Sequence, residues 1–386
     1  MDSGLLTKER TILFVFVLIS YGSFCQGTRE GNVTTLLIKT FKSTDTDIRS
    51  FYQLIKETSY SFAHEHFLRE KDSLKLDDWF YYKLLGSYVD ENFPNQDQNF
   101  KALFCWYILN KSGYDIRIEN SYQDILLYAY STEDVYTTQF RKSDKTYICL
   151  NCNKPSKGMV NLSSVSLVNP QAKPFSFVIN KIPNLPSHRV EEFELGYRSE
   201  LVQKLLLYKI QVNITILNFL EDYPNINMNI LFDTPLSPEA YNSLVPQIKT
   251  YTEGKDKIYQ AMFLLEFVRK AFLLGKDDDP NSFGREKWTT PEEALYYPYL
   301  DCEDRSAIFY SLVKEILDVP MIIVDYPENE HVNIGLSFEG ITEGLIYKDR
   351  KYLVCETTSK DEPFGQNKLY QKWKYKVIGE YTPKKK

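Results

Sequence analysis

The part of the sequence that most constrains the fold lies between residues 302 and 355. It opens with CEDRSAIFYSLVKEIL, in which apolar residues recur at the three- and four-residue spacing of an amphipathic helix. Asp301 is placed to cap this helix, and Glu303 and Asp304 put acidic groups in its first turn. Three runs of strand length follow, PMIIVDY, HVNIGLSF and KYLVCET. The pattern predicts a helix packed on an antiparallel sheet, which is an α+β unit.

The chain is long enough to hold further domains, because 386 residues suffice for two or three units of about 150 residues each. Residues 26–158 mix helical periodicity with short alternating runs and predict an N-terminal α+β domain. Residues 159–250 contain PFSFVINKIP and YKIQVNITILNFL, whose alternating or β-branched pattern predicts a β-rich middle domain. Residues 251–386 form the C-terminal domain, in which a helix over 256–274 precedes the stretch described above.

The amino-terminal leader, residues 1–25, is typical of a secretory signal peptide and is not expected to belong to the fold. Lys8 and Arg10 precede an uncharged, mostly apolar stretch over 11–24, with a passable cleavage site after Cys25. A lipid anchor on Cys25 and an uncleaved anchor are the alternatives. No second apolar run of spanning length follows in the sequence. We therefore expect an exported protein, periplasmic or extracellular, without a membrane span after cleavage.

Composition and charge exclude several classes of protein. Hydrophobic residues make up 43% of the chain and charged residues 25%, which is a globular composition rather than a disordered or collagen-like one. The net charge is −6, and the only dense basic run in the sequence is Lys384-Lys385-Lys386 at the terminus. Nucleic acid is therefore not an expected partner.

Cysteine usage leaves at least one thiol unpaired. After cleavage of the leader five cysteines remain, at positions 105, 149, 152, 302 and 355. An odd number in an exported chain cannot pair completely. Cys149 and Cys152 have CxxC spacing, but without a second CxxC they predict either a local disulfide or two free thiols rather than a zinc site. We expect no metal and no cofactor.

One set of residues offers the parts of a thiol active site, which needs a nucleophile, a base and a group that orients the base. Cys302 opens the predicted helix, where unpaired backbone N–H groups favour a thiolate and point to where an oxyanion would form. His331 starts a strand directly after the turn YPENE, and Glu356 ends the next strand. The sequence therefore predicts Cys302 as nucleophile, His331 as base and Glu356 as orienting carboxylate. Taken singly, a helical Cys is more often an inert apolar residue, and a lone His before a strand is more often at the surface.

These segments resemble the transglutaminase-like superfamily, a papain-type fold, and in particular its exported bacterial members. The resemblance rests on FLLEFVRKAF, SFGREKW, PEEALYYPYLDCEDRS, the turn before HVNIGLSF, and KYLVCETTS, and it covers residues 255–371. Its most specific part is DCEDRS at a helix start. The resemblance implies a nucleophile at Cys302, a base at His331 and the third member of a triad at Glu356, with a protein or peptide as substrate.

Two departures from the family pattern bear on activity. The family usually has Asp at the third position, often followed by Pro-Thr, whereas this sequence has Glu356-Thr357-Thr358. Glu is one methylene longer than Asp, so the triad is either retained through a bond to Nδ1 of His331 or weakened. In addition, residues 328–330 are inserted before the histidine, where relatives tend to have a compact Pro-Gly-His.

The N-terminal domain has features of a second, degenerate copy of the C-terminal unit. When 205 is subtracted from each residue number, FYSLVKEILDVPMII falls on FCWYILNKSGYDIRI. At this offset the three predicted active-site positions hold Asp97, Leu126 and Asn151, so no catalytic residue is kept. The alternative is that the chain contains two unrelated α+β units.

Two classes of function follow from these patterns. The first is an exported cysteine peptidase or amidase that forms a thioester at Cys302 and passes the acyl group to water or to an amine. In that case Trp288 and Tyr299 are candidates to assist the Cys302 amide at the oxyanion. The second is a catalytically weakened protein that keeps the fold to bind a peptide or an envelope partner. A redox role for the CxxC pair is disfavoured, since the pattern puts Cys149 in a strand and not at a helix start.

Overall fold

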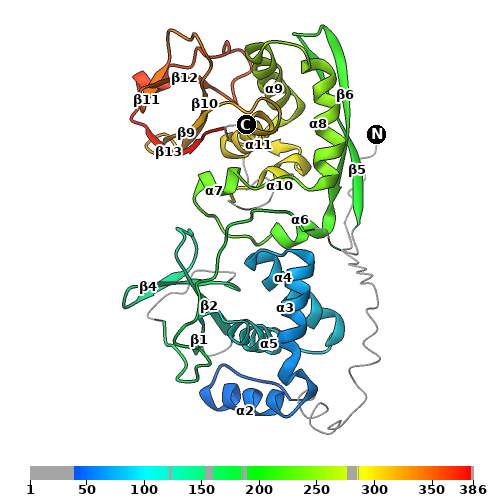
Figure 1. Ribbon diagram of the computed structural model, residues 1–386, viewed down its shortest axis with the longest axis vertical. Helices are drawn as coiled ribbons and strands as arrows, with labels where there is room; N and C mark the ends of the chain where they lie inside the picture. The colour runs from blue at the N-terminus through cyan, green and yellow to red at the C-terminus, as the bar shows by residue number, and fades with distance from the viewer. Residues whose placement is uncertain are drawn as a thin grey trace, which may run out of the picture.

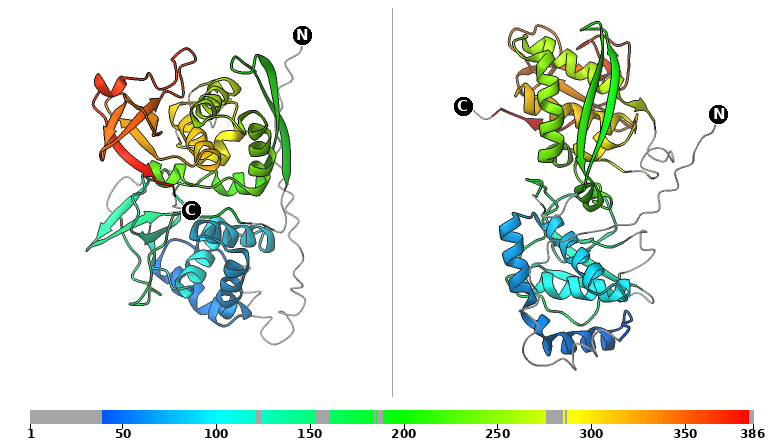
Figure 2. Two further views of the ribbon diagram at one scale, coloured as in Figure 1. Left: turned by 45° about the horizontal axis from the view of Figure 1, so that its top comes forward. Right: turned by 90° about the vertical axis from the view of Figure 1, so that its right-hand side faces the viewer.

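The computed structural model describes residues 39–120, 124–152, 160–183, 185, 189–275, 285 and 287–383 (Figure 1). The predicted leader over 1–25 lies outside these residues. The described chain mixes helices with two larger sheets that are both antiparallel, so the predicted α+β class is confirmed. Figures 1 and 2 show two lobes, one that contains the helices coloured blue to cyan and one that contains the segments coloured yellow to red. No helix in the described ranges is long and apolar enough to cross a membrane.

The N-terminal lobe packs helices against a four-stranded sheet of order β1-β2-β4-β3. Its elements are α2 (Asp45–Lys56), the 3-10 helix η2 (Ser59–Phe62), α3 (Ala63–Leu74), α4 (Asp78–Asn92), α5 (Gln98–Lys111), β1 (Ile116–Asn120), β2 (Ile125–Ser131), β3 (Gln139–Lys142) and β4 (Lys145–Cys149). Helix α5 is the centre of this lobe, because all its residues from 102 to 110 are buried and no face is left for solvent. The side chain of Asp97 caps this helix by accepting a hydrogen bond from the N–H of Phe100 at 2.9 Å.

The middle of the described chain holds one long hairpin followed by three helices. Its elements are β5 (Val190–Ser199), β6 (Lys204–Asn213), α6 (Ile214–Leu220), α7 (Met228–Phe232) and α8 (Pro238–Thr252). The strand predicted from YKIQVNITILNFL is right up to Asn213 and wrong after it. The side chain of Asn213 accepts hydrogen bonds from the N–H groups of Thr215 and Ile216, and this cap turns the β-branched run into a helix.

The apolar run over 174–183 was expected to form strand, and this expectation is wrong. The run is an irregular segment in which Phe175, Phe177 and Ile179 are nevertheless buried. The N–H of Phe175 donates to the backbone oxygen of Tyr130 in β2 at 2.7 Å, but several of the next N–H groups donate to side chains, among them carboxylates of helix α4 and its cap. The bonds are from Ser176 to Asp78 at 3.0 Å and from Asn180 to Asp77 at 2.7 Å. Alternating burial therefore produced a strand-like pattern without a sheet.

The C-terminal lobe contains the helix and the three strands that the sequence predicts. Its elements are α9 (Lys257–Ala271), β7 (Leu273–Leu274), α10 (Pro291–Tyr296), β8 (Tyr299–Leu300), α11 (Cys302–Ile316), β9 (Met321–Tyr326), β10 (His331–Leu336), β11 (Leu345–Tyr347), β12 (Arg350–Cys355), η3 (Leu369–Gln371) and β13 (Lys376–Tyr381). The five-stranded sheet has the order β11-β12-β10-β9-β13, so β10 is its central strand. Helix α11 packs on β10, and this contact brings the start of the helix to the start of the strand.

The two larger sheets share one topology. Subtracting 205 carries β9, β10, β11 and β12 to 116–121, 126–131, 140–142 and 145–150, each within one residue of β1, β2, β3 and β4. The same subtraction carries α11 to 97–111, where α5 lies. The strand order β9-β10-β12-β11 also matches the order β1-β2-β4-β3. This is the arrangement that a duplication of one helix-and-sheet unit would produce.

Hydrogen bonds from both lobes meet at Asn225. The N–H of Tyr136, which lies in the N-terminal lobe, donates to the backbone oxygen of Asn225 at 2.7 Å. The N–H of Trp288, in the C-terminal lobe, donates to Oδ1 of the same residue at 3.0 Å. The two rings lie edge to face with centroids 5.5 Å apart. Asn225 therefore fixes an aromatic pair that spans the two lobes.

A buried ion pair holds the segment before α10 against the end of α6. The side chains of Lys287 and Glu293 are only 1% and 2% exposed, and they form a salt bridge. Nζ of Lys287 also donates to the backbone oxygen of Leu220 at 2.6 Å. Burial lowers the pKa of Lys287, and the carboxylate of Glu293 counteracts that shift. Since the two charges have little access to water, each depends on the other.

Replacing Lys287 by Ala should destabilise the protein strongly, because it leaves the Glu293 carboxylate buried without its partner. We expect a loss of about 3–5 kcal/mol in the free energy of unfolding, measured by denaturant unfolding of the full chain. The matched control is Lys348→Ala, which breaks an exposed pair with Glu380 and should leave the free energy of unfolding nearly unchanged, because water screens that pair. Equal losses in the two variants would contradict a structural role for the buried pair.

Candidate active site

Cys302 is the first residue of α11 and lies directly after β8. Asp301 caps the helix, because its side chain accepts hydrogen bonds from the N–H groups of Glu303 and Asp304 at 3.0 and 3.2 Å. The sulfur of Cys302 donates to Oε2 of Glu303 at 2.8 Å, and it lies 3.7 Å from a second possible acceptor, the backbone oxygen of Glu330. The thiol is thus held at the mouth of the helix, as the sequence predicts.

His331 and Glu356 are brought together by the pairing of β10 with β12. His331 is the first residue of β10, and Glu356 follows the last residue of β12. Nε2 of His331 lies 2.8 Å from Oε2 of Glu356. The expected bond between these residues therefore exists, but it uses Nε2, and the expectation that Glu356 would reach Nδ1 is wrong. Nδ1 is left as the ring nitrogen that could exchange a proton with a thiol.

Glu356 is held by several donors besides the imidazole. Its Oε1 accepts hydrogen bonds from the N–H and the hydroxyl of Thr358 at 2.9 and 2.5 Å, and its Oε2 accepts one from Asn367 at 3.2 Å. Burial by itself would raise the pKa of Glu356, but the hydrogen bond and charge of His331, with the donors of Thr358, lower it to about 2. Burial would likewise lower the pKa of His331, and Glu356 reverses this and raises it. The pair is therefore stabilised in its charged form.

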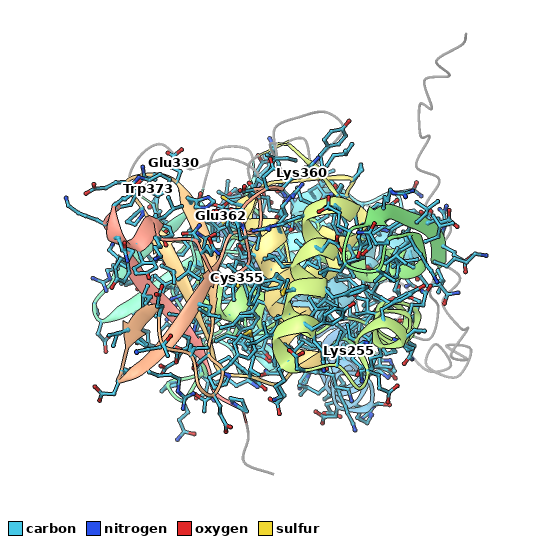
Figure 3. All side chains as sticks on the ribbon, turned by 90° about the horizontal axis from the view of Figure 1, so that it is seen from above. Lys255, Glu330, Cys355, Lys360, Glu362 and Trp373 are labelled. Carbon is cyan, nitrogen blue, oxygen red and sulfur yellow. A yellow bond between two sulfur atoms is a disulfide. The ribbon has the colours of Figure 1, made fainter. Side chains whose placement is uncertain are left out.

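Aromatic rings pack around the imidazole and fix its plane. The ring of Tyr326 stacks on His331 with centroids 6.1 Å apart, and the ring of Trp373 meets it edge to face at 6.2 Å. Figure 3 shows Trp373 and Glu330 on the same side of the molecule, with Cys355 in the interior of the view. The sequence did not point to Trp373, because it lies beyond β12 and reaches His331 only through the fold.

The sulfur of Cys302 lies against the start of β10. It lies 3.7 Å from the backbone oxygen of Glu330, and the backbone of Val332 is close enough to stabilise its ionised form. These two residues flank His331 in the chain, so thiol and imidazole are neighbours in space. Within the described chain no hydrogen bond joins the sulfur to the ring itself. The thiol proton of Cys302 is therefore directed at the carboxyl group of Glu303 and not at the imidazole.

The environment of Cys302 opposes ionisation of its thiol. Burial raises the pKa of Cys302, and the nearby carboxyl groups of Glu303 and Asp301 raise it further. The expectation that the helix start would lower this pKa is therefore wrong. The reason is that burial outweighs the effect of the helix start, that Glu303 and Asp301 add negative charge, and that Asp301 occupies the N–H groups of Glu303 and Asp304. Burial, with the charge of Asp301, also raises the pKa of Glu303 to about 7.

The remaining cysteines leave Cys302 chemically distinct. Cys149 and Cys152 form a disulfide, so of the two readings of the CxxC spacing the local disulfide is confirmed. Cys105 and Cys355 are free but buried, whereas Cys302 is half-exposed and also free. Cys302 is therefore the accessible thiol among the described residues. No three His, Cys, Asp or Glu side chains in the described ranges are arranged to hold a metal ion.

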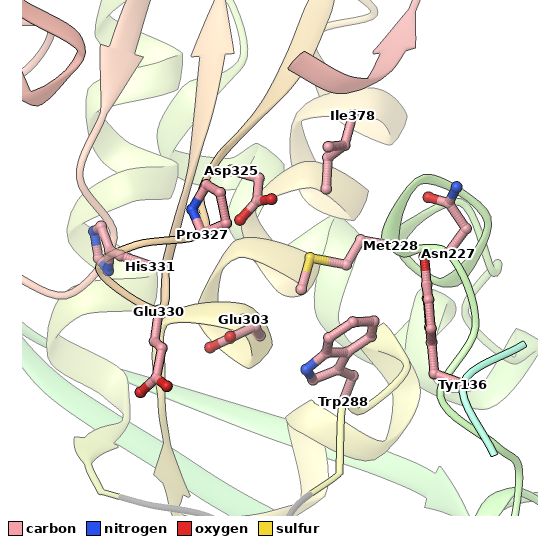
Figure 4. Close-up of a pocket in the computed structure, with 10 residues that line it drawn as sticks. All are labelled: Tyr136, Asn227, Met228, Trp288, Glu303, Asp325, Pro327, Glu330, His331 and Ile378. Atoms are coloured by element: carbon pink, nitrogen blue, oxygen red, sulfur yellow. The ribbon is translucent and has the colours of Figure 1, made fainter. Parts of the chain in front are cut away.

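A cavity of about 520 Å³ opens beside the site (Figure 4). Its lining residues come from both lobes and are Tyr136, Asn227, Met228, Trp288, Glu303, Asp325, Pro327, Glu330, His331 and Ile378. Trp288, a candidate for the oxyanion site on sequence grounds, is in this wall. The sequence analysis missed Tyr136 and Asp325, because no local pattern indicates that residues so far apart in the chain line the same cavity.

No protein-family model, curated protein or solved structure matches the chain. The assignment of a function therefore depends on the geometry of Cys302, His331 and Glu356 and on the cavity beside them.

Replacing Glu356 by Gln should lower the pKa of His331, because it removes the charge that raises it. The measurement is an NMR titration of the histidine ring signals, with His331→Gln to assign the signal.

Glu356 has a folded pKa below its ordinary value of 4.5, so its contribution to stability is present above that pH and is lost as pH falls towards 2. The Gln variant should lack this acid-dependent loss. Glu343→Gln, an exposed carboxylate, should change neither property.

Replacing Glu303 by Gln should make Cys302 more acidic, because the amide can still accept the thiol hydrogen bond but carries no charge. We expect alkylation of Cys302 near neutral pH to become about tenfold faster, the equivalent of one pKa unit. The rate is measured by mass spectrometry of the Cys302 peptide after timed labelling. Glu315→Gln, on the same helix but away from the thiol, is the matched control. An unchanged rate in the Glu303 variant would refute the proposed effect of this carboxyl group.

Proposed function

We propose that the protein is a transglutaminase-like thiol enzyme that cleaves an amide bond of a protein or peptide through a thioester on Cys302. The observation that carries the proposal is the His331–Glu356 pair at 2.8 Å, placed by β10 and β12 next to a free thiol at a helix start. These are a nucleophile, a base and a group that orients the base, which together define this class of site. We include in the proposal that the leader over 1–25 directs export.

The first half of the reaction forms the thioester. Neutral His331 takes the proton from the sulfur of Cys302 through Nδ1, and the sulfur attacks the carbonyl carbon of the amide. The N–H of Cys302 has no acceptor among the described hydrogen bonds, so it is available to the oxyanion. The C–N bond then breaks, and the imidazolium gives its proton to the departing amine. Glu356 keeps the ring oriented and stabilises its charge in between.

The second half releases the acyl group. Water, or an amine in a transfer reaction, attacks the thioester carbonyl while His331 takes its proton. The bond from carbon to sulfur breaks, the sulfur recovers a proton, and a carboxylic acid or a new amide leaves. No further reactant is required. The cavity beside His331 is the space from which the attacking molecule or part of the substrate would approach.

A second candidate function is a binding protein that retains the fold without turnover. It is favoured by the hydrogen bond from Cys302 to Glu303, which leaves the thiol protonated and unbonded to the imidazole. In that case the cavity would bind a peptide or an envelope partner, and the His331–Glu356 pair would be structural. We also propose that the N-terminal lobe is a degenerate copy of the same unit, because its helix and strands recur at the offset of 205.

Alkylation with iodoacetamide separates the two candidates. For an enzyme we expect the rate at Cys302 to rise with pH as His331 loses its proton, and to fall by about 10²-fold or more in His331→Ala. Because Glu356 raises the pKa of His331, the rise should begin at a higher pH than for an unperturbed histidine. The buried Cys105 and Cys355 serve as internal controls in the same digest.

The binding protein makes the opposite prediction. Cys302 would then react no faster than a small free thiol, and His331→Ala would leave its rate unchanged. Loss of alkylation in Cys302→Ser confirms which peptide is being followed. Circular dichroism of each variant shows whether the fold is retained, so that a lost reaction is not mistaken for unfolding.

A further inference from the structure

The cavity beside the site has more acidic than basic groups in its wall, because its one basic lining group, His331, is already paired with Glu356. Three of its lining residues are acids from three different elements: Glu303 in the first turn of α11, Asp325 in β9 and Glu330 in the turn before β10. The described lining residues include no lysine or arginine. Figure 4 shows Glu303 and Asp325 on one side of the space and Trp288 and Tyr136 on the other. A carboxylate wall thus faces an aromatic wall.

The aromatic wall is held at its backbone and suits a cation. The backbones of Trp288 and Tyr136 are both hydrogen-bonded to Asn225, and their rings lie edge to face. Trp is the best of the aromatic side chains at binding an ammonium or guanidinium over its face, and Tyr also does so. Met228, which is buried, adds an apolar floor for a methylene chain. The combination of apolar floor, ring faces and carboxylates fits a long side chain with a positive end.

The three carboxyl groups have cationic neighbours in Lys376 and His331, but these are not direct partners. In the described part of the chain none of the three forms an ion pair with Lys or Arg. Burial raises the pKa of Asp325. Lys376, which lies opposite Asp325 in the strand register, lowers this pKa but only in part offsets the effect of burial. The pKa of Glu303 is raised more strongly, by burial and by the charge of Asp301. A cation that entered the cavity would stabilise the ionised forms of Asp325 and Glu303 without competing with a Lys or Arg partner.

Glu303 connects the cavity to the nucleophile, because the same carboxyl group lines the cavity and accepts the thiol hydrogen bond of Cys302. We propose that the cavity is a subsite for the Lys or Arg side chain of a substrate, and that pairing of this cation with Glu303 frees Cys302 to ionise. The coupling half of this inference rests on the proposed function. Binding of the cation stands on the cavity alone. When the cation neutralises Glu303, the thiol proton can pass to His331 without creating two adjacent negative charges.

Binding is tested with agmatine, a short methylene chain with a guanidinium at one end and an ammonium at the other, and with pentanol as a neutral chain of similar length. Saturation-transfer NMR on the full chain should detect agmatine and not pentanol at equal concentration. Asp325→Asn should weaken agmatine binding by at least about fivefold, while the exposed Asp349→Asn should not weaken it. Equal binding of pentanol, or unchanged agmatine binding in Asp325→Asn, would overturn the subsite.

Coupling is tested by the thiolate absorbance of the wild type minus that of Cys302→Ser, titrated with pH. Saturating agmatine should move the ionisation of Cys302 to lower pH, and sodium chloride at the same ionic strength should not. In Glu303→Gln, agmatine should have no such effect, because the charge it neutralises is already gone. No movement in the wild type would overturn the coupling. If agmatine binds but Cys302 shows no fast alkylation under any condition, the subsite stands and the proposed enzyme function fails.

Discussion

The bond between His331 and Glu356 is the interaction on which the site depends, and two buried arginines hold the segment that makes it. Nε and Nη2 of Arg269, in α9, donate to the backbone oxygen of Glu356 at 2.8 and 2.5 Å. Arg305, in α11, reaches the backbone oxygen of Thr357 at 3.4 Å. Burial lowers the pKa of both guanidinium groups, that of Arg305 to about 10, while the charge of Glu356 counteracts the shift. Arginine suits this task because its planar donors stay charged and serve several carbonyls at once.

Burial holds the base His331 in place, and it also opposes ionisation of the nucleophile Cys302. Glu356 has enough donors to remain ionised, whereas Cys302 has two carboxyl groups nearby and few donors. The N-terminus of α11 would favour a thiolate, but the cap by Asp301 satisfies its first N–H groups. The difference between a reactive and an inert thiol thus depends less on the helix than on the charge of Glu303. Control by one neighbouring carboxyl group is easily reversed, since its pKa of about 7 lies near neutrality.

The sequence was informative where local pattern and tertiary placement agree. The helix at Cys302 and the strands that carry His331 and precede Glu356 follow from periodicity, and the structure brings the last two within hydrogen-bond distance. Properties that depend on contacts between distant segments could not be predicted. The use of Nε2, the raised pKa of the thiol and the part played by Tyr136 all arise from such contacts. The strand expected over 174–183 is absent for a related reason, because beyond Phe175 several backbone N–H groups bond side chains rather than a neighbouring strand.

The N-terminal lobe repeats the helix and strands of the C-terminal unit with other side chains at the three site positions. Asn151, at the position that corresponds to Glu356, also follows the equivalent strand, and its Oδ1 accepts a hydrogen bond from the N–H of Leu127 on the neighbouring strand at 2.8 Å. Asp97, at the position of the nucleophile, caps its helix. Both side chains serve backbone groups, and neither is a thiol that could act as the nucleophile of acyl transfer. This lobe nevertheless supplies Tyr136 to the wall of the cavity. Its contribution to the site is therefore a surface, and its geometry can persist without selection on a catalytic residue.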